Sequence, residues 1–215
     1  MKNKIPNALE RLNKVLPLKY HQNRCDAEVK KLHQALLKSF VENGRVLTND
    51  EMSAYLDDVE RAISILQEFD MVVTSAEGVV TGVYPFTMET REHKVKVNNF
   101  TVHAMCALDA LAISSMFAID TKISSRCRVT KDDIYIEQSE TNIKNADSAA
   151  GIFFGIIWAA TAEGSCANSL CMEMLFLKNE SVADKWLHED IDDREIFTLD
   201  EAVEFSARFF VPLMS

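Results

Sequence analysis

The chain has 215 residues, of which 47% are hydrophobic and 26% are charged, and its formal net charge at pH 7 is −10. This composition excludes disordered, collagen-like and low-complexity chains, because the apolar fraction is that of an ordinary globular protein. The acidic charge argues against a dedicated binder of nucleic acid or anionic membranes, since such proteins place Lys and Arg against phosphate. The charge is uneven, because residues 1–50 carry ten Lys or Arg against five Asp or Glu.

The sequence predicts a cytoplasmic protein that does not bind membranes. Residues 1–20 lack the continuous apolar core of a secretory signal. The longest apolar run, residues 149–162, is shorter than the roughly 20 residues that span a bilayer. The five cysteines are an odd number without a CxxC pair, so we expect free thiols in a reducing compartment rather than disulfides.

The first part of the chain is typical of a helical region. Apolar residues recur at helical spacing over residues 5–15, which predicts an amphipathic helix in an N-terminal segment 1–25 that packs against the body. A capping box, Thr48-Asn-Asp-Glu51, is expected to open a short helix, and residues 57–60 repeat the pattern. The predicted helices after the first cover residues 26–41, 48–55 and 59–69.

Residues 71–74 and 79–83 then predict two strands joined by a turn. Three helices followed by a hairpin is the order of a winged helix, which we predict for residues 26–84. Such a fold often binds DNA through its last helix. Here that helix and its approach carry four acidic residues against one basic residue, so phosphate would repel them and a packing scaffold is the favoured interpretation. These charged residues are Asp57, Asp58, Glu60, Arg61 and Glu68.

Residues 85–215 alternate strands with helices, which predicts an α+β body with a mixed antiparallel sheet. Periodicity does not decide whether residues 151–158 form a buried strand or a short helix. The other expected strands are 93–97 and 100–103, joined by an Asn98-Asn99 turn, then 122–129, 134–137 and 170–177, and the expected helices are 105–117, 182–187 and 199–210.

The densest group of chemically active side chains is His103-Ala-Met-Cys-Ala-Leu-Asp109. If a helix begins near Ala104, Cys106 lies in its first turn and Asp109 lies on the same face. The helix N-terminus would favour the thiolate form of Cys106, which is a soft ligand for soft metals. The alternative is a buried structural cysteine beside an aspartate of the first turn.

These residues resemble the organomercurial (alkylmercury) lyases of bacterial mercury resistance. The resemblance lies in Cys106-Ala-Leu-Asp-Ala-Leu111, in Ile123-Ser-Ser-Arg-Cys127, in Cys171 ahead of an aromatic and aliphatic strand, and in Ala183-Asp-Lys-Trp186. Family members also begin with a winged-helix-like domain that is not a regulator. The resemblance covers most of the chain.

The resemblance implies that two cysteines and an aspartate cleave a carbon–mercury bond by protonolysis, and it places these roles on Cys106, Asp109 and Cys171. One thiolate captures RHg⁺, a second converges on the metal, and the carboxyl group moves the proton to the leaving carbon. The residues expected to bind the Hg(II) product are Cys106, Cys171 and Asp109, with the two sulfurs holding the ion as a dithiolate. No organic cofactor is expected, small-molecule thiols should assist release, and a mercuric reductase is the expected acceptor.

The remaining cysteines carry weaker predictions. Cys127 matches a family cysteine that is usually structural, Cys166 is an auxiliary thiol or a loop residue, and Cys25 belongs to no motif. A zinc site from His103, Cys106, Cys166 and Cys171 lacks the usual close ligand pairs.

Two other functions stay open at this point. The first is a related lyase that acts on another organometal or organometalloid, because the family often has an aromatic residue where this chain has Met105. The second is a winged-helix transcription factor whose cysteines sense a metal or a thiol.

Overall fold

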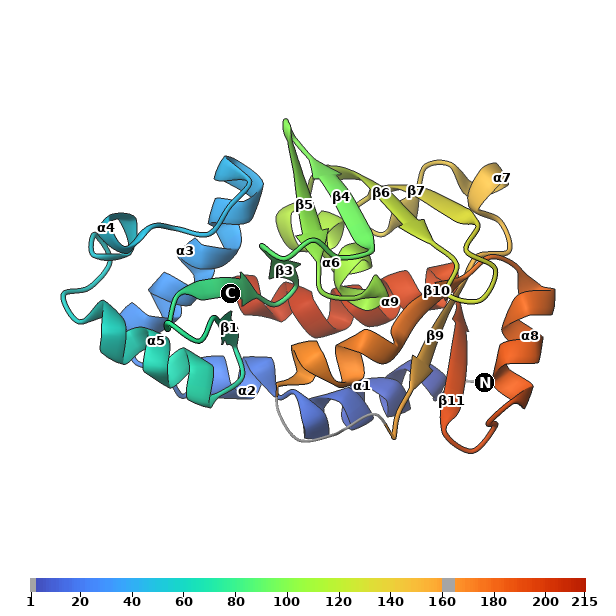
Figure 1. Cartoon of the computed structure of the whole chain (residues 1–215), viewed down its shortest axis with the longest axis horizontal. Coiled ribbons are helices and arrows are strands. Elements are labelled where there is room, and N and C mark those ends of the chain that lie inside the picture. Colours follow the sequence, from blue (N-terminus) through green and yellow to red (C-terminus); the bar gives the residue numbers. More distant parts are fainter. Residues whose placement is uncertain (1–2, 160–164) are drawn as a thin grey trace.

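The computed structural model describes residues 3–159 and 165–215, so the end of the apolar run 149–162 lies outside the described residues. Two antiparallel sheets and the helices between and around them form a mixed α+β fold (Figure 1). Helix α9 (Leu199–Phe210) lies centrally, packed on α6 (Ala107–Phe117) and on α1 (Lys4–Val15). Within the described ranges no helix is long and apolar enough to cross a membrane.

The predicted N-terminal helices are present, with an additional short helix, α2 (Leu18–Gln22). Helix α3 (Ala27–Asn43) ends at Gly44, whose φ of 69° is left-handed. The Thr48–Glu51 capping box is confirmed and opens α4 (Asn49–Met52). The predicted capping box at residues 57–60 is wrong: the side chain of Asp58 accepts from the Arg61 amide and begins α5 (Val59–Glu68) one residue later.

The larger sheet starts in the helical region and continues into the body. In the described chain its strand order is β1-β2-β3-β5-β4-β6-β7-β8, and all neighbours are antiparallel. The predicted hairpin is β1 and β2, and β2 also pairs with β3 beyond residue 84. The strands are β1 (Val72–Thr74), β2 (Val80–Val83), β3 (Phe86–Thr87), β4 (His93–Val97), β5 (Phe100–Ala104), β6 (Asp120–Arg126), β7 (Asp133–Ser139) and β8 (Asn142–Ile143).

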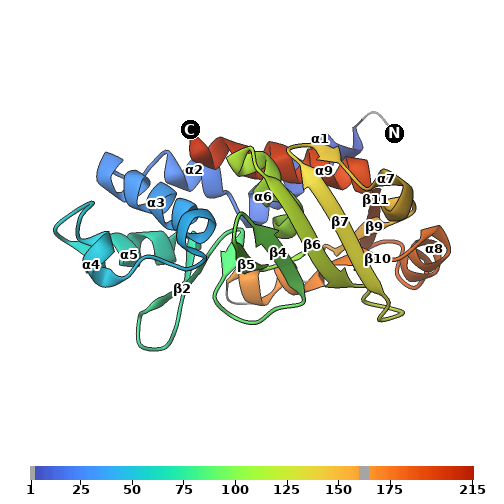
Figure 2. The same ribbon diagram turned by 90° about the horizontal axis from the view of Figure 1, so that it is seen from above.

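Buried and exposed side chains alternate along the strands of this sheet, and one face of the sheet packs against α6. Along β4, His93, Val95 and Val97 are buried and the intervening lysines are exposed, which is the period of a strand with one solvated face. The turn to β5 is made at Asn98, whose φ is 49°. Figure 2 shows β5, β4, β6 and β7 side by side, with α6 and α9 behind them.

The segment 151–158, for which periodicity left strand and helix open, forms a strand of the smaller sheet. Its order is β10-β9-β11, with β9 (Phe153–Ile157) paired to both neighbours. The helix α8 (Glu180–His188) packs on this sheet through Trp186. Strand β11 (Arg194–Thr198) was not predicted, because its residues do not alternate between apolar and polar side chains.

The predicted strand 170–177 is only half correct. Residues Leu170–Glu173 form a 3₁₀ helix, η2, and only Met174–Leu177 form β10. Arg91 and Arg128 donate to the backbone carbonyls of Ala167 and Met172, so in this segment side chains take the place of a neighbouring strand. The helix predicted over 105–117 likewise begins later, at Ala107.

The other described elements complete the chain. They are α7 (Ala146–Ala149), the 3₁₀ helix η1 (Cys166–Asn168) and a C-terminal 3₁₀ turn, η3 (Val211–Met214), after α9. None of these short elements was predicted, because each has only three or four residues, too few to show a periodicity.

Gly44 is the position at which a single methyl group should cost most. Its φ is 69°, and a Cβ atom there would lie 2.6 Å from the Phe100 ring. We expect Gly44→Ala to lower the free energy of unfolding by about 2–4 kcal/mol, from the left-handed backbone and from overpacking together. Gly78, with φ 78° and open space around it, is the matched control, for which only about 1–2 kcal/mol is expected. Urea unfolding checks both variants, and equal losses would contradict the steric argument.

Candidate active site

Cys106 and Asp109 are positioned by the start of α6. Strand β5 ends at Ala104, and Cys106 is the N-cap residue, with its Sγ atom accepting from the Asp109 amide at 3.4 Å. A side chain that caps a helix in this way is held close to the third helical residue. Both side chains are only 1% exposed. The predicted proximity of thiol and carboxyl is therefore confirmed, although the helix begins at Ala107 and not near Ala104.

Cys171 reaches the same place from the 3₁₀ helix η2. Arg91 holds the segment by donating to the Ala167 carbonyl and to the Asn168 side chain, at 2.9 and 3.1 Å. Arg128 donates to the Met172 carbonyl at 2.6 Å. These contacts fix the backbone on both sides of Cys171, whose side chain is buried and 3% exposed.

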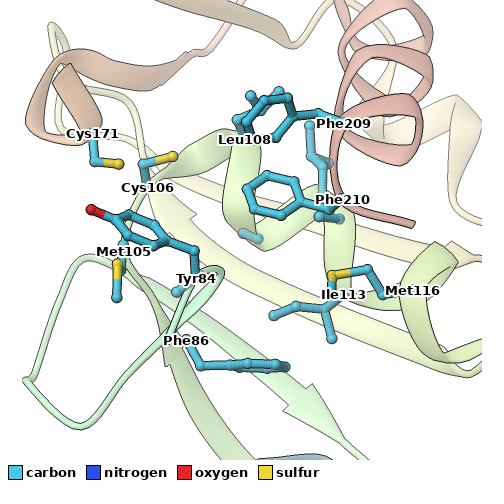
Figure 3. Close-up of a cluster of buried hydrophobic side chains, with 14 of the residues drawn as sticks. Tyr84, Phe86, Met105, Cys106, Leu108, Ile113, Met116, Cys171, Phe209 and Phe210 are labelled. Carbon is cyan, nitrogen blue, oxygen red and sulfur yellow. The ribbon is translucent and has the colours of Figure 1, made fainter. Parts of the chain in front are cut away.

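The two sulfurs and the carboxylate converge. The Sγ atoms of Cys106 and Cys171 and a carboxylate oxygen of Asp109 all lie within 4.8 Å of one another. Figure 3 shows the two thiols next to each other, one at the start of α6 and one from the separate C-terminal segment, with Tyr84 beneath them. Residues 65 positions apart in the sequence therefore form one compact site.

Burial makes the Asp109 carboxyl a weak acid. Loss of hydration raises its pKa to about 7. Its hydrogen-bonding contacts with Cys106 lower the pKa, but by less than burial raises it. One of its oxygens, Oδ2, is buried without a hydrogen-bond partner among the described residues. A carboxyl group that gains and loses a proton near neutral pH is suited to general acid–base catalysis.

The prediction that the helix N-terminus favours the thiolate form of Cys106 is wrong for the free protein. Burial raises its pKa to about 12, and the nearby Asp109 carboxylate raises it further, while Cys171 opposes these effects. The pKa of Cys171 is also raised, by its hydrogen-bonding contacts with Cys106 and Cys166 and by burial. Both thiols are therefore protonated at neutral pH, and a bound thiophilic metal would be needed to displace their protons.

A pocket connects Cys171 to solvent. Its volume is about 460 Å³, and Cys171 lines it whereas Cys106 and Asp109 do not. Arg91 and Arg128, which fix the backbone of η2, also form part of its wall. The lining residues are Glu89, Thr90, Arg91, Glu92, His93, Met105, Arg128, Asn168, Cys171 and Met172. A ligand that enters this pocket meets Cys171 first.

Two residues of the N-terminal region hold η1, the 3₁₀ helix that precedes Cys171. Asp70 accepts from the Cys166 amide at 2.8 Å, and the Tyr84 hydroxyl accepts from the Ala167 amide at 2.7 Å. The Tyr84 hydroxyl in turn donates to Asp70 at 3.1 Å. Burial raises the pKa of both side chains. Neither residue was predicted, because no local pattern marks a side chain that binds the backbone of a segment over 80 residues away.

The other cysteines lie in different surroundings. Cys166 is buried, and its Sγ atom lies 3.7 Å from that of Cys171. Cys127 is fully buried directly after β6, where it accepts from the Thr130 amide. Cys25 is half-buried near the start of α3 and donates to the His21 carbonyl.

The zinc set considered in the sequence, His103, Cys106, Cys166 and Cys171, is not assembled among the described residues. The Nδ1 atom of His103 contacts the backbone of Arg91, and the group able to hold a metal among the described residues is Cys106, Asp109 and Cys171. Sulfur is nevertheless abundant here, since the Cys106 thiol donates to the Met174 thioether at 3.5 Å. Two thiols of this kind bind soft metals, and the carboxyl group beside them can exchange a proton with either.

Comparison with known proteins points in the same direction as this geometry. The family model described as MerB, alkylmercury lyase, matches residues 86–211. A solved structure titled "Crystal structure of the mercury-bound form of MerB2" is similar to this chain, with a TM-score of 0.74 and 20% sequence identity. The similarity covers 96% of this chain and 100% of the other, so the two share a fold.

Asp109 should make stability depend on pH. Its pKa of about 7 in the folded state lies above the ordinary value of 3.8, so the unfolded chain releases this proton first. Stability is therefore lost as the pH rises from about 4 to 7. The Asp109→Asn variant lacks this loss, and its free energy of unfolding relative to the parent should increase over that interval. Denaturation at several pH values checks this, with the exposed Asp57→Asn as control, and parallel curves for parent and Asp109→Asn would contradict the assigned burial effect.

Proposed function

The chain belongs to the alkylmercury lyase family and is an organomercurial lyase, and we propose that Cys106, Asp109 and Cys171 carry out its reaction. The observation that carries this proposal is the convergence of two thiols and one partly unpaired carboxyl group within 4.8 Å. The reaction converts RHg⁺ and H⁺ into RH and Hg(II), by protonolysis of the carbon–mercury bond.

Cys171 captures the substrate, because it lines the pocket and Cys106 does not. Mercury is a soft metal and binds sulfur in preference to oxygen or nitrogen. Coordination expels the thiol proton despite the raised pKa. The first product is RHg–S of Cys171, and the released proton leaves through the pocket to solvent.

Cys106 supplies the second sulfur, and Asp109 transfers its proton. Near neutral pH a fraction of Asp109 is ionised and accepts the proton of Cys106, whose sulfur then binds the mercury. The protonated carboxyl group delivers this proton to carbon as the carbon–mercury bond breaks. The hydrocarbon RH leaves, Hg(II) remains between the two sulfurs, and Asp109 returns to its carboxylate form.

Product release requires another thiol, because a buried dithiolate holds Hg(II) tightly. We propose that small-molecule thiols remove the ion and that no organic cofactor takes part. A mercuric reductase is the proposed final acceptor of Hg(II), and a cytoplasmic location would provide both the thiols and the reducing conditions.

Residues 26–84 are proposed to act as a winged-helix-like scaffold, between an N-terminal segment 1–25 and a catalytic domain 85–215. The helix order and the β1–β2 hairpin support this proposal. The scaffold role is supported by Asp70 and Tyr84, which bind the loop ahead of Cys171.

Substitution of the three residues tests the proposed chemistry. We expect Cys106→Ser and Cys171→Ser to abolish benzene release from phenylmercury, because serine is a poor mercury ligand. Asp109→Asn should slow release by about 10²–10⁴-fold, the usual contribution of a positioned acid–base group. Gas chromatography of the headspace measures the product, with Cys25→Ser as the control that keeps the parent rate. Full activity of Cys171→Ser would refute the proposed pair.

The same assay distinguishes the substrate classes. Met105, the residue that raises the question of substrate class, lies in the pocket wall. A related lyase acting on another organometal would release more hydrocarbon from an organotin than from methylmercury. We expect the opposite order. Equal inactivity on both compounds would contradict either lyase.

The scaffold proposal predicts that the protein does not bind DNA. The exposed face around α5 carries Asp57, Asp58, Glu60 and Glu68, which would repel phosphate most strongly at low ionic strength. Fluorescence anisotropy with labelled duplex DNA at low salt should show no change, with and without Hg(II). Salt-sensitive binding altered by the metal would instead favour a metal-responsive transcription factor.

A further inference from the structure

The mercury-binding thiols have a third sulfur beside them that the proposed reaction does not use. The Sγ atom of Cys166 lies 3.7 Å from that of Cys171, and its side chain is 3% exposed. Cys171 therefore has two neighbouring thiols, Cys106 and Cys166. A sulfur that is shared in this way can keep hold of an ion while the other ligand changes.

The position of Cys166 is fixed by its surroundings. Its amide donates to Asp70, and the next amide donates to the Tyr84 hydroxyl. Arg91 donates to the Ala167 carbonyl. The backbone that carries this thiol is thus bound by three side chains, so little conformational entropy needs to be lost when the thiol binds a ligand.

We propose that Cys166 is a third mercury-binding residue, which receives Hg(II) from Cys106 after the carbon–mercury bond has been cleaved. This inference rests on the proposed function. In the transfer, the bond from mercury to the Cys106 sulfur breaks and a bond to the Cys166 sulfur forms, while Cys171 stays bound. The proton of Cys166 passes to Cys106. No oxidant or reductant is needed, and the charge of the site does not change.

The transfer has a chemical purpose. It restores the Cys106 thiol beside Asp109. A thiol held within the site also competes for mercury at a high effective concentration, which can strengthen binding by about 10²–10⁴-fold over a single site. Product release then begins from a Cys166–Cys171 dithiolate, with Cys171 still at the wall of the pocket, where an external thiol reaches it.

Binding of HgCl₂ alone tests the proposal without requiring catalysis. All proteins carry Cys25→Ser to remove the half-buried thiol, and glutathione competes for the metal while the ultraviolet absorbance of the mercury–sulfur bonds is followed. We expect Cys106→Ser to keep one Hg(II) through Cys166 and Cys171. Adding Cys166→Ala to that variant should weaken binding by about 10²–10⁴-fold, the contribution of a second linked ligand. Equal affinities of the two proteins would overturn the proposal.

A kinetic measurement provides the second test. With phenylmercury in excess and external thiol limiting, Cys166→Ala should turn over at least about tenfold more slowly than its parent, and excess thiol should reduce the difference. Cys166→Ser should behave in the same way, and circular dichroism checks that both variants are folded. Equal turnover at limiting thiol would contradict the role of Cys166. Absence of benzene release by the parent would instead refute the proposed function and leave the HgCl₂ comparison valid.

Discussion

The site depends on one constraint: a carboxyl group is buried beside two thiols without enough hydrogen bonds to keep it ionised. Asp109 is held there by the first turn of α6, and its Oδ2 atom has no partner among the residues described. An unpaired buried charge is costly, so the group adopts a pKa of about 7. The same burial keeps both thiols protonated until a soft metal arrives. The same loss of hydration therefore sets the pKa of the carboxyl group and the pKa of the two thiols proposed to bind the metal.

The fold buries the two thiols and the carboxyl group, and it leaves a pocket through which Cys171 is reached. Helix α6 lies between the larger sheet and α9, so the residues at its N-terminus are removed from water. The opening is on the other side, where Cys171 and the two arginines line the pocket. Because η2 is a 3₁₀ helix held by side chains and not a strand, Cys171 points across to α6 without disturbing the smaller sheet.

Local patterns in the sequence predicted one part of the site and several helix boundaries. The pairing of Cys106 with Asp109 follows from their spacing, and the capping box at Thr48 follows from residue type. Cys171 could be assigned only by resemblance to a family, since 65 residues separate it from Cys106. Its 3₁₀ conformation was missed because Leu170–Leu177 is apolar apart from Glu173, and the arginines that hold it come from elsewhere in the chain.

The error about the Cys106 thiolate has a similar origin. A helix N-terminus lowers the pKa of an exposed thiol, but the sequence does not reveal how completely α9 and the sheet cover that terminus. Desolvation is the larger effect here. Tertiary packing therefore reversed the sign of a pKa shift that local structure alone would predict.

Asp70 and Tyr84 accept hydrogen bonds from the backbone ahead of Cys171, so they bear on how much of the chain the site needs. The family match starts at residue 86, after both of these side chains. A fragment limited to the matched region would contain every proposed reactive group, yet the amides of Cys166 and Ala167 would have lost their acceptors. A unit that keeps these hydrogen bonds therefore has to include Asp70 and Tyr84, and it is longer than the segment that sequence comparison recognises.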